Sequence, residues 1–334
     1  MASVAGVSPI NYSPIERKEI APSKISPLRV ELIFKEHQEN HAGVTGLEIL
    51  DGSRFITGSN DRSIKTWERT SNKSLSTQYV DSQYRIWHMQ LLSGNVCVAI
   101  GWSPADPGKN SIRIYNSIDG KFHDLMKHSG DITSFAVSKQ GLLASGSYDW
   151  SAKIWEPFSS QNLHTYGSGA IVHCVGFLPD GKTFVCGNQK GEIQFWEITQ
   201  DKPDSRKPDK VFHNPCPLSS LLVMQDGKIA TGSIDGVVRI WDSSEIPEKA
   251  LKKELRGHFE YVSALAERPD HILVSGSGDK RMILWDTDTG ESWASPQEHT
   301  NKIHAVAVFD DNSVLTGSLD GTVKLWTVIP AARL

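Results

Sequence analysis

Histidine and aspartate recur as pairs along the chain, and such a pair can orient an imidazole for general-base catalysis. Five histidines each precede an aspartate by 20 to 22 residues. The pairs are His41 with Asp61, His128 with Asp149, His213 with Asp235, His258 with Asp279, and His299 with Asp320. No G-x-S-x-G elbow or other constellation adds a nucleophile to a base and its orienting group. We therefore predict no catalytic residue.

One other histidine spacing suggests metal binding. The segment HQENH places His37 and His41 four residues apart, and on a helix both side chains would face one metal. The segment is instead predicted to be a loop that runs into a strand, and His41 already has a partner in Asp61. No glycine-rich phosphate loop ending in Gly-Lys-Ser/Thr is present. The sequence thus predicts no metal site and no cofactor.

Composition and charge argue against several classes of function. The 334 residues are 38% hydrophobic and carry a formal net charge of −4, with no long basic run, which argues against nucleic-acid binding. No stretch approaches the ~18 apolar residues that span a bilayer, and the N-terminus lacks a secretory signal. The cysteines show no C-x-x-C spacing and are predicted to be reduced thiols, so we expect a cytoplasmic or nuclear protein.

The His–Asp pairs belong to a longer repeat. An apolar strand, a small-Gly-Ser or Asn step, the Asp and an aromatic anchor recur, as in LASGSYDWSAKIW and VLTGSLDGTVKLW. The anchors are 40 to 48 residues apart, and the second and fourth copies are degenerate. The seven anchors are Trp67, Tyr115, Trp155, Trp196, Trp241, Trp285 and Trp326. Alternating apolar and polar residues between turns predict one four-stranded antiparallel sheet per repeat, which must stack on its neighbours to bury both faces.

This period and signature resemble the WD40 repeat family over residues 28–334. The resemblance implies an all-β fold, a seven-bladed β-propeller. It also implies that the His and Asp are structural members of a buried hydrogen-bond network with a Ser or Thr and the strand Trp. In the fourth copy Lys190 replaces the Asp, and Gly167 or a neighbour replaces the His. Joint loss agrees with a shared network, because a half-satisfied buried network is worse than none.

The two ends of the repeat region indicate how the ring closes. Only TVIPAARL follows Trp326, so the last blade lacks an outer strand, and LRVELIF at residues 28–34 is an alternating strand with no blade before it. We predict that this N-terminal strand completes the last blade and hides the open sheet edge. Residues 1–27, rich in Ser, Pro and Ala, are predicted to be a flexible extension, with a docking or targeting tail as the alternative.

Four of the ten tryptophans, Trp87, Trp102, Trp150 and Trp293, are not repeat anchors. The family resemblance implies which positions contact partners on the top face: those flanking the first apolar residue of each innermost strand, and the residue before the repeated Asp. In the second and third blades these are Arg85, Trp87, Asp131 and Tyr148, and we add the neighbouring Trp102 and Trp150. Other blades contribute Ala170 and Val172, Tyr261, Lys302 and His304. Tryptophan, tyrosine and arginine are the residue types that dominate binding hot spots.

We therefore expect a monomeric, non-enzymatic scaffold that binds a protein or peptide through this aromatic patch. One alternative is an aromatic cage for methylated Lys or Arg, with Asp131 as the counter-charge. Another rests on SGSYDWSAKIW and DGKIATGSIDGVVRIW, which resemble blades of the phospholipase A2-activating protein family and imply ubiquitin binding. A propeller enzyme is the remaining alternative, for which the sequence offers no catalytic constellation.

Overall fold

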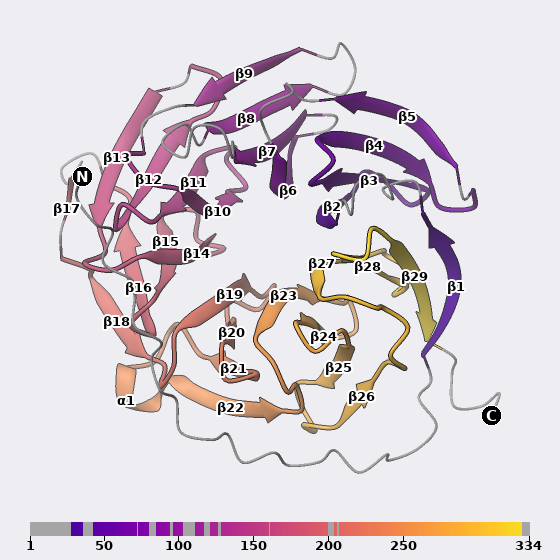
Figure 1. Cartoon of the computed structure of the whole chain (residues 1–334). Helices are drawn as coiled ribbons and strands as arrows, with labels where there is room; N and C mark the ends of the chain where they lie inside the picture. Colours follow the sequence, from indigo (N-terminus) through magenta and orange to yellow (C-terminus); the bar gives the residue numbers. More distant parts are fainter. Residues whose placement is uncertain are drawn as a thin grey trace, which may run out of the picture.

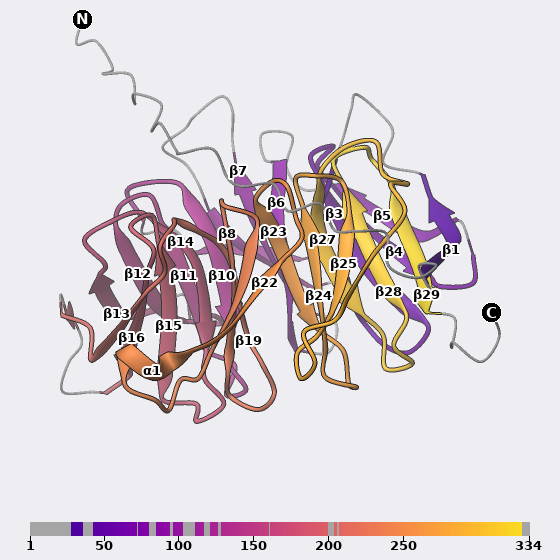
Figure 2. The same ribbon diagram turned by 90° about the horizontal axis from the view of Figure 1, so that it is seen from below.

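In the computed structural model, seven sheets are arranged in a ring (Figure 1), and their innermost strands line a central channel. Seen from the side, the strands of each sheet run between the two faces of a disc (Figure 2). The predicted seven-bladed, all-β propeller is confirmed. The structure describes residues 28–35, 43–71, 73–79, 85–93, 96–102, 111–116, 121–125, 128–159, 161–199, 204–205 and 207–328. The predicted extension at residues 1–27, His37 and His41 lie outside these ranges.

The first four blades follow one another along the chain, each from the innermost to the outermost strand. The first contains β2 (Val44–Ile49), β3 (Arg54–Ser59), β4 (Ser63–Glu68) and β5 (Ser74–Tyr79). The second contains β6 (Arg85–Ser93), β7 (Val96–Trp102), β8 (Ser111–Asn116) and β9 (Phe122–Leu125). The third contains β10 (Ile132–Val137), β11 (Leu143–Ser147), β12 (Ser151–Glu156) and β13 (Gln161–Gly167), with β17 (Asp204–Ser205) at its edge. The fourth contains β14 (Val172–Phe177), β15 (Thr183–Asn188), β16 (Glu192–Glu197) and β18 (Lys210–His213).

The remaining blades have the same order, except that the last one combines both ends of the propeller. The fifth contains β19 (Leu218–Val223), β20 (Ile229–Ser233), β21 (Val237–Trp241) and β22 (Leu251–Arg256), with the short α1 (Pro247–Ala250) before β22. The sixth contains β23 (Val262–Glu267), β24 (Ile272–Ser277), β25 (Met282–Asp286) and β26 (Ser292–Ala294). The seventh contains β27 (Ile303–Val308), β28 (Val314–Ser318), β29 (Val323–Val328) and β1 (Leu28–Phe34).

Strand β1 closes the ring, as the sequence predicts. It pairs antiparallel with β29, from Leu28 opposite Val328 to Phe34 opposite Val323, and the two strands lie side by side in Figure 1. The Phe34 ring then packs edge to face on Phe55 and Trp67 of the first blade. Closure by the N-terminal strand therefore joins the last blade to the first through a shared core.

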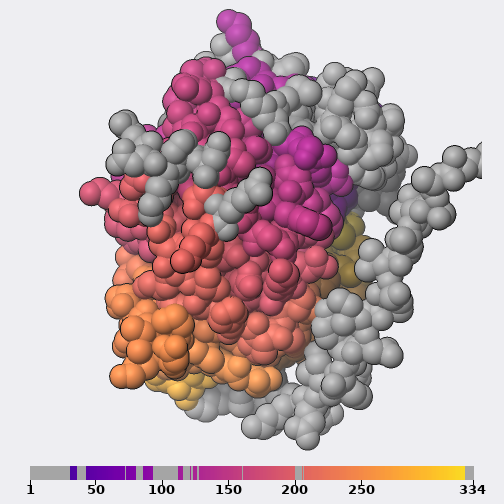
Figure 3. All heavy atoms as spheres, turned by 90° about the vertical axis from the view of Figure 1, so that its left-hand side faces the viewer, coloured from indigo at the N-terminus to yellow at the C-terminus, as the bar shows by residue number. Residues whose placement is uncertain are grey.

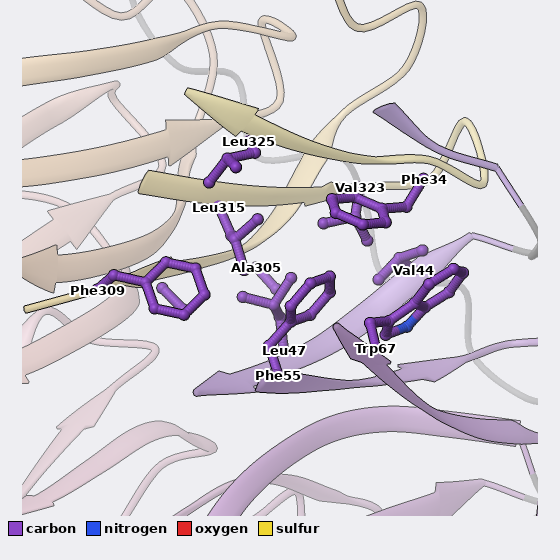
Figure 4. Close-up of a cluster of buried hydrophobic side chains, with 11 residues drawn as sticks. Phe34, Val44, Leu47, Phe55, Trp67, Ala305, Phe309, Leu315, Val323 and Leu325 are labelled. Carbon is purple, nitrogen blue, oxygen red and sulfur yellow. The ribbon is translucent and has the colours of Figure 1, made fainter. Parts of the chain in front are cut away.

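The hydrophobic core lies between blades and not within them. The buried apolar side chains of the described residues form seven clusters, and each cluster combines residues of two neighbouring blades. Figure 4 shows the cluster between the seventh and first blades, where Phe34, Val44 and Trp67 face one another. In the space-filling view successive blades abut along the outer wall (Figure 3). A single sheet would expose this surface, so each blade depends on its neighbours for stability.

The described ranges contain no helix with the length and apolar character that crossing a membrane requires. Cys174, Cys186 and Cys216 are free thiols, while the side chain of Cys97 lies outside the described residues.

Candidate functional site

The predicted hydrogen-bond network is present in the third, sixth and seventh blades. In the third blade His128 Nδ1 donates to Asp149 at 2.8 Å, while Ser145 Oγ lies 2.7 Å from His128 Nε2 and accepts from Trp155 Nε1 at 2.8 Å. The same bonds join His258 with Asp279 and His299 with Asp320. Although burial opposes it, the hydrogen bond from His128 keeps the pKa of Asp149 well below its usual range. Each network therefore holds a charged Asp in its turn.

The predicted pairing of His213 with Asp235 in the fifth blade is wrong. His213 ends the outer strand of the fourth blade with its side chain exposed, and the following Asn214 is buried instead. Asn214 Nδ2 donates to Ser233 Oγ at 3.0 Å, and the buried Arg239 donates to Asp235 Oδ2 at 2.9 Å. A guanidinium supplies several donors in a planar fork, so Arg239 provides the donor that histidine provides in the third, sixth and seventh blades.

The first and fourth blades differ from this pattern in other ways. Asp61 accepts from the Ser63 backbone at 2.8 Å, and its predicted partner His41 lies outside the described residues. In the fourth blade, where Lys190 stands in place of the Asp, Asn188 Nδ2 donates to Ser168 Oγ at 3.1 Å. Asn188 Oδ1 also accepts from the Glu192 backbone at 3.0 Å, as Asp149 Oδ1 accepts from the Ser151 backbone at 3.0 Å in the third blade.

A β-bulge sets the direction of one side chain at the start of every innermost strand. In all seven blades the pairing register shifts there by one residue. The extra residues, here called the bulge residues, are Thr45, Trp87, Thr133, His173, Ser219, Ser263 and His304. A bulge turns the extra side chain out of the regular ladder. All seven line a central channel of about 650 Å³.

The bulge residues are of two chemical kinds. Four carry hydroxyls, and each hydroxyl donates to a backbone carbonyl of the next blade: Thr45 to Ile86, Thr133 to Val172, Ser219 to Val262 and Ser263 to Ile303. These bonds tie neighbouring blades together at the end of the channel. The other three, Trp87, His173 and His304, carry rings in place of a hydroxyl. Trp87, His173 and His304 therefore stand at positions where a hydroxyl would hydrogen-bond to the next blade.

The rings at these positions contact residues of other blades. Trp87 meets His304 edge to face, with ring centroids 4.9 Å apart. Tyr148 and His173 make a wider contact of the same kind at 6.2 Å. The side chains of Trp87 and Tyr148 remain 42% and 51% exposed. Burial lowers the pKa of His304 to about 4, and the charge of Lys302 lowers it further. His304 is therefore a neutral aromatic partner for Trp87 at neutral pH.

A second set of contacts defines which side of the ring these residues occupy. In six blades the residue at the repeated turn donates its backbone N–H to the residue two positions before the bulge residue. The bonds are Asn60 to Gly43, Tyr148 to Asp131, Gln189 to Ile171, Ile234 to Pro217, Gly278 to Tyr261, and Leu319 to Lys302. The turns between second and third strands therefore lie beside the starts of the innermost strands. We call this side of the ring the top face.

The sequence-based choice of Ala170 and Val172 in the fourth blade is wrong by one residue. Val172 is fully buried and pairs with Asn188, so His173 is the bulge residue and Ile171 the flanking one. Val172 and Asn188 are 16 positions apart, whereas the equivalent Ile132 and Ser147 are 15 apart. The longer hairpin and the adjacent apolar residues Ile171 and Val172 make the first apolar residue of this strand ambiguous. Counting from Ile171 selects Ala170 and Val172, whereas counting from Val172 selects Ile171 and His173.

The other predicted contact residues are placed as follows. Trp150 is 59% exposed in the turn after Tyr148, and the backbone carbonyl of Asp131 accepts from Tyr148. Lys302 Nζ lies over the Tyr261 ring, 5.0 Å from its centroid. Arg85 and Trp102 pair through their backbones across β6 and β7, and their side chains lie outside the described residues.

Deeper in the channel, two titratable groups are shifted by burial. Desolvation raises the pKa of Glu48 to about 8, against a hydrogen bond from the Leu91 backbone. It lowers the pKa of His88 to about 4, and nearby His304 acts in the same direction. None of the hydrogen bonds described above joins Glu48 or His88 to a nucleophilic side chain. Within the described residues, no group of three or more His, Cys, Asp or Glu side chains could hold a metal ion.

The model of the WD domain, G-beta repeat matches six segments of the chain: residues 29–68, 120–156, 160–197, 206–242, 249–286 and 290–327. The chain belongs to the WD40 repeat family. The unmatched residues 69–119 include most of the degenerate second blade. Members of the family are typically scaffolds for protein interactions, and this is the class of protein that the match supports.

Relatives of this WD40 protein include a receptor-associated protein and a subunit of a guanine nucleotide-binding protein. It is 26% identical over 238 residues to a serine-threonine kinase receptor-associated protein of Gallus gallus, covering 60% of this chain and 67% of the relative. It is also 26% identical to a guanine nucleotide-binding protein subunit beta of Zea mays, covering 50% of this chain and 47% of that protein. The match thus spans about half to two thirds of these relatives. The WD40 β-propeller domain of Doa1 has the same fold, with a TM-score of 0.77 and 18% identity over 92% of this chain and 99% of that one.

Proposed function

We propose that this propeller is a non-enzymatic scaffold that binds a peptide or an extended segment of a partner protein across its top face. The observation that carries the proposal is the exposure of Trp87, Tyr148 and Trp150, which keep 42%, 51% and 59% of their surface in water. All three lie on the top face. Aromatic side chains contribute strongly to hot spots because they bury a large area and lose little rotamer entropy.

The arrangement around the channel supports the same proposal. Trp87 and His173 occupy bulge positions at which other blades use a hydroxyl to bind their neighbour. The fold therefore does not require a ring there, because Thr or Ser satisfies the backbone at the same position. Rings on one rim of a channel offer flat apolar surfaces to an incoming side chain.

The test compares the wild-type chain with a Trp87→Ala, Tyr148→Ala double variant in affinity purification followed by mass spectrometry. We expect the variant to fold and to lose its partners. A matched control is Phe158→Ala. Phe158 is 62% exposed and follows the last residue of β12, whereas Trp150 precedes its first residue, so the two side chains lie at opposite ends of the strand. A folded double variant that retains every partner would refute the proposal.

Titrations distinguish the more specific alternatives. Ubiquitin binding would be seen by titration with ubiquitin itself, and its loss in the double variant would place that site on the top face. An aromatic cage would bind a trimethyl-lysine peptide more tightly than the unmodified peptide, because the ring faces attract the cation. Hydrolytic turnover by the wild-type chain would instead favour the enzyme alternative.

A further inference from the structure

The outer strand of the first blade differs from most other outer strands of the ring. A strand at the edge of a sheet presents N–H and C=O groups to any extended chain, and proteins protect such edges with charged side chains, short strands or a covering segment. Strands β1, β9, β18 and β22 each contain at least one Lys, Arg, Asp or Glu, and β26 has only three residues. The outer strands of the first and third blades, β5 and β13, are longer than β26 and contain no Lys, Arg, Asp or Glu. These two edges therefore lack protection by charge or by shortness.

The uncharged edge of β13 is covered by another segment of the chain. Strand β17 pairs with it in parallel, with Asp204 opposite Thr165 and Ser205 opposite Tyr166, and it lies outside β13 in Figure 1. The third blade is therefore the one sheet of five strands in the part of the chain that the structure describes. The added strand is a short extended segment and not the edge of another blade.

Strand β5 presents a similar backbone edge without such a cover. It is the last strand of its sheet, and within the described part of the chain residues 75–79 make no backbone hydrogen bond outside their ladder with β4. The registers of the two blades agree, because Thr77 lies opposite a lysine of β4 as Thr165 lies opposite a lysine of β12, and a bulge precedes both threonines. The two residues of β5 that correspond to the ones paired with β17 are therefore Thr77 and Gln78.

The side chains along this edge indicate what kind of strand would fit it. Leu75 is 55% exposed and Tyr79 is 71% exposed, and Ser76 and Thr77 between them are exposed as well. In strand addition the main chain supplies hydrogen bonds and the side chains supply specificity. A charged side chain placed against Leu75 or Tyr79 would lose water without gaining a partner. The edge therefore favours an extended segment that carries apolar side chains and no charge.

We propose that β5 binds an extended, uncharged segment of a partner protein, which joins the first blade as a fifth strand. The third blade already accepts a fifth strand of this kind. A second copy of this chain is a poorer occupant, because a six-residue edge about 20 Å long buries far less than the roughly 1,200 Å² of a stable interface. The inference goes beyond the proposed function, because β5 lies on the outer rim of the ring and the top-face rings lie at its channel (Figure 1).

The probe for the test is the peptide Thr-Val-Thr-Val-Thr-Val with blocked ends and a fluorescent label. One control peptide has the same sequence with an N-methyl group on every residue, which removes its hydrogen-bond donors, and a second has Lys in place of each Val. We expect the wild-type chain to bind the first peptide and neither control. In hydrogen exchange, the amides of residues 75–79 that face away from β4 should become protected when this peptide is added. Equal binding of the three peptides, or binding of none, would overturn the inference.

The variant for the test is Leu75→Lys combined with Tyr79→Lys, which gives this edge the charges that other outer strands carry. We expect affinity for the uncharged peptide to fall by about tenfold or more, because the apolar contacts are lost. Thermal unfolding should change little, because both side chains are mostly exposed. The matched control is Leu251→Lys, which adds a lysine to the already charged β22 at a position that is 42% exposed and should leave the affinity unchanged. Equal affinity of the wild type and the double variant would contradict the proposal.

Hydrogen exchange of the free chain tests the other possible occupants of the edge. Without peptide, the outward-facing amides of residues 75–79 should exchange rapidly at every protein concentration. Slow exchange at all concentrations would mean that the chain covers this edge itself, and slow exchange only in concentrated protein would mean that a second copy covers it. Either result would overturn the inference.

The Trp87→Ala, Tyr148→Ala variant separates this inference from the proposed function. It should bind the uncharged peptide as the wild type does, because its changes lie on the top face. If this variant loses the peptide, the peptide binds on the top face and the inference fails. If it keeps the peptide and also keeps every partner, the proposed function fails and the inference stands.

Discussion

The Trp87 and His304 rings meet edge to face at 4.9 Å although they belong to the second and seventh blades. The first blade lies between these blades in the ring, and its own bulge residue is the smaller Thr45. The two rings thus extend over that blade at the end of the channel. Because the seventh blade is completed by β1, this contact connects the closing blade to the second one independently of the core.

The Trp87–His304 contact gives a first prediction. His304→Ala removes the edge-to-face partner, so Trp87 should become more exposed and its fluorescence should shift to longer wavelength. The stability loss should be small, about 1 kcal/mol, which is typical of an aromatic pair. The emission attributable to Trp87 is obtained by subtracting the spectrum of a Trp87→Phe variant from that of each parent. An unchanged difference spectrum would show that His304 does not position Trp87.

Channel residues predict how stability depends on pH. The pKa of Glu48 is about 8 in the folded chain against 4.5 as its ordinary value, so the unfolded chain loses this proton first. Stability should therefore fall as pH rises from about 4.5 to 8. The pKa values of His88 and His304 are about 4 against 6.5, so the unfolded chain binds more protons and stability should rise as pH rises from 4 to 6.5. Together these groups favour an optimum near pH 6.5.

The measurement is urea unfolding at pH 6.5 and pH 8. Glu48→Gln keeps the shape of the neutral acid and cannot ionise, so its stability relative to the wild type should increase by about 1–2 kcal/mol between pH 6.5 and pH 8. The gain should shrink toward pH 5. His88→Gln serves as the control, because it leaves the alkaline decline in place. An equal stability difference at every pH would contradict the assignment to Glu48.

The hydrogen-bond network of the third blade gives another prediction. Ser145→Ala removes the hydroxyl that joins Trp155 to His128, which leaves two buried polar nitrogens without this partner. We expect a loss of about 2–4 kcal/mol in the free energy of unfolding. Ser145→Thr is the matched rescue, since Thr316 makes the same bonds in the seventh blade. Equal stability of the Ala and Thr variants would argue against the network.

Much of this fold was predictable because one physical requirement repeats along the chain. Each blade must bury its faces against two neighbours, so the strand pattern and the anchor recur in each copy. The sequence also contains a spacing that argues against the predicted pairing of His213 with Asp235 in the fifth blade. His213 stands 22 residues before Asp235, whereas the histidines of the third, sixth and seventh blades stand 21 before their Asp, which is the separation of Asn214. The residue at this separation is Asn214, which is buried, while His213 beside it is exposed.

The contacts on the top face could not be predicted in the same way. Trp87 and His304 are more than 200 residues apart and occupy blades that are not neighbours, so no spacing connects them. The bulges turn both side chains toward the channel, but the sequence pattern of one strand does not show which residue of another blade a bulge residue meets. The sequence therefore identifies candidate residues, and the structure identifies which of them meet.

In the fifth blade Arg239, not a histidine, donates to the repeated Asp, and this predicts that stability depends on the guanidinium group. Arg239 donates through its fork to Asp235 at 2.9 Å and to Glu254 at 2.7 Å while almost fully buried. Arg239→Lys keeps the charge and loses the fork, so we expect a loss of about 3 kcal/mol or more in the free energy of unfolding. The control is Arg256→Lys, since Arg256 is exposed and also binds Glu254. Similar losses for both variants would contradict a special role for the buried fork.

Ring closure by β1 gives the final prediction. Phe34 is buried against Phe55 and Trp67, so Phe34→Ala leaves a cavity at the contact between the seventh and first blades and should cost about 3–5 kcal/mol. Glu31→Ala, on the same strand and exposed, should cost little. Deleting residues 28–34 should be far more damaging than deleting 1–27, because it leaves the outer edge of β29 unpaired. Thermal unfolding and size-exclusion chromatography measure both effects. Equal stability of the Phe34 and Glu31 variants would show that this strand does not fasten the ring.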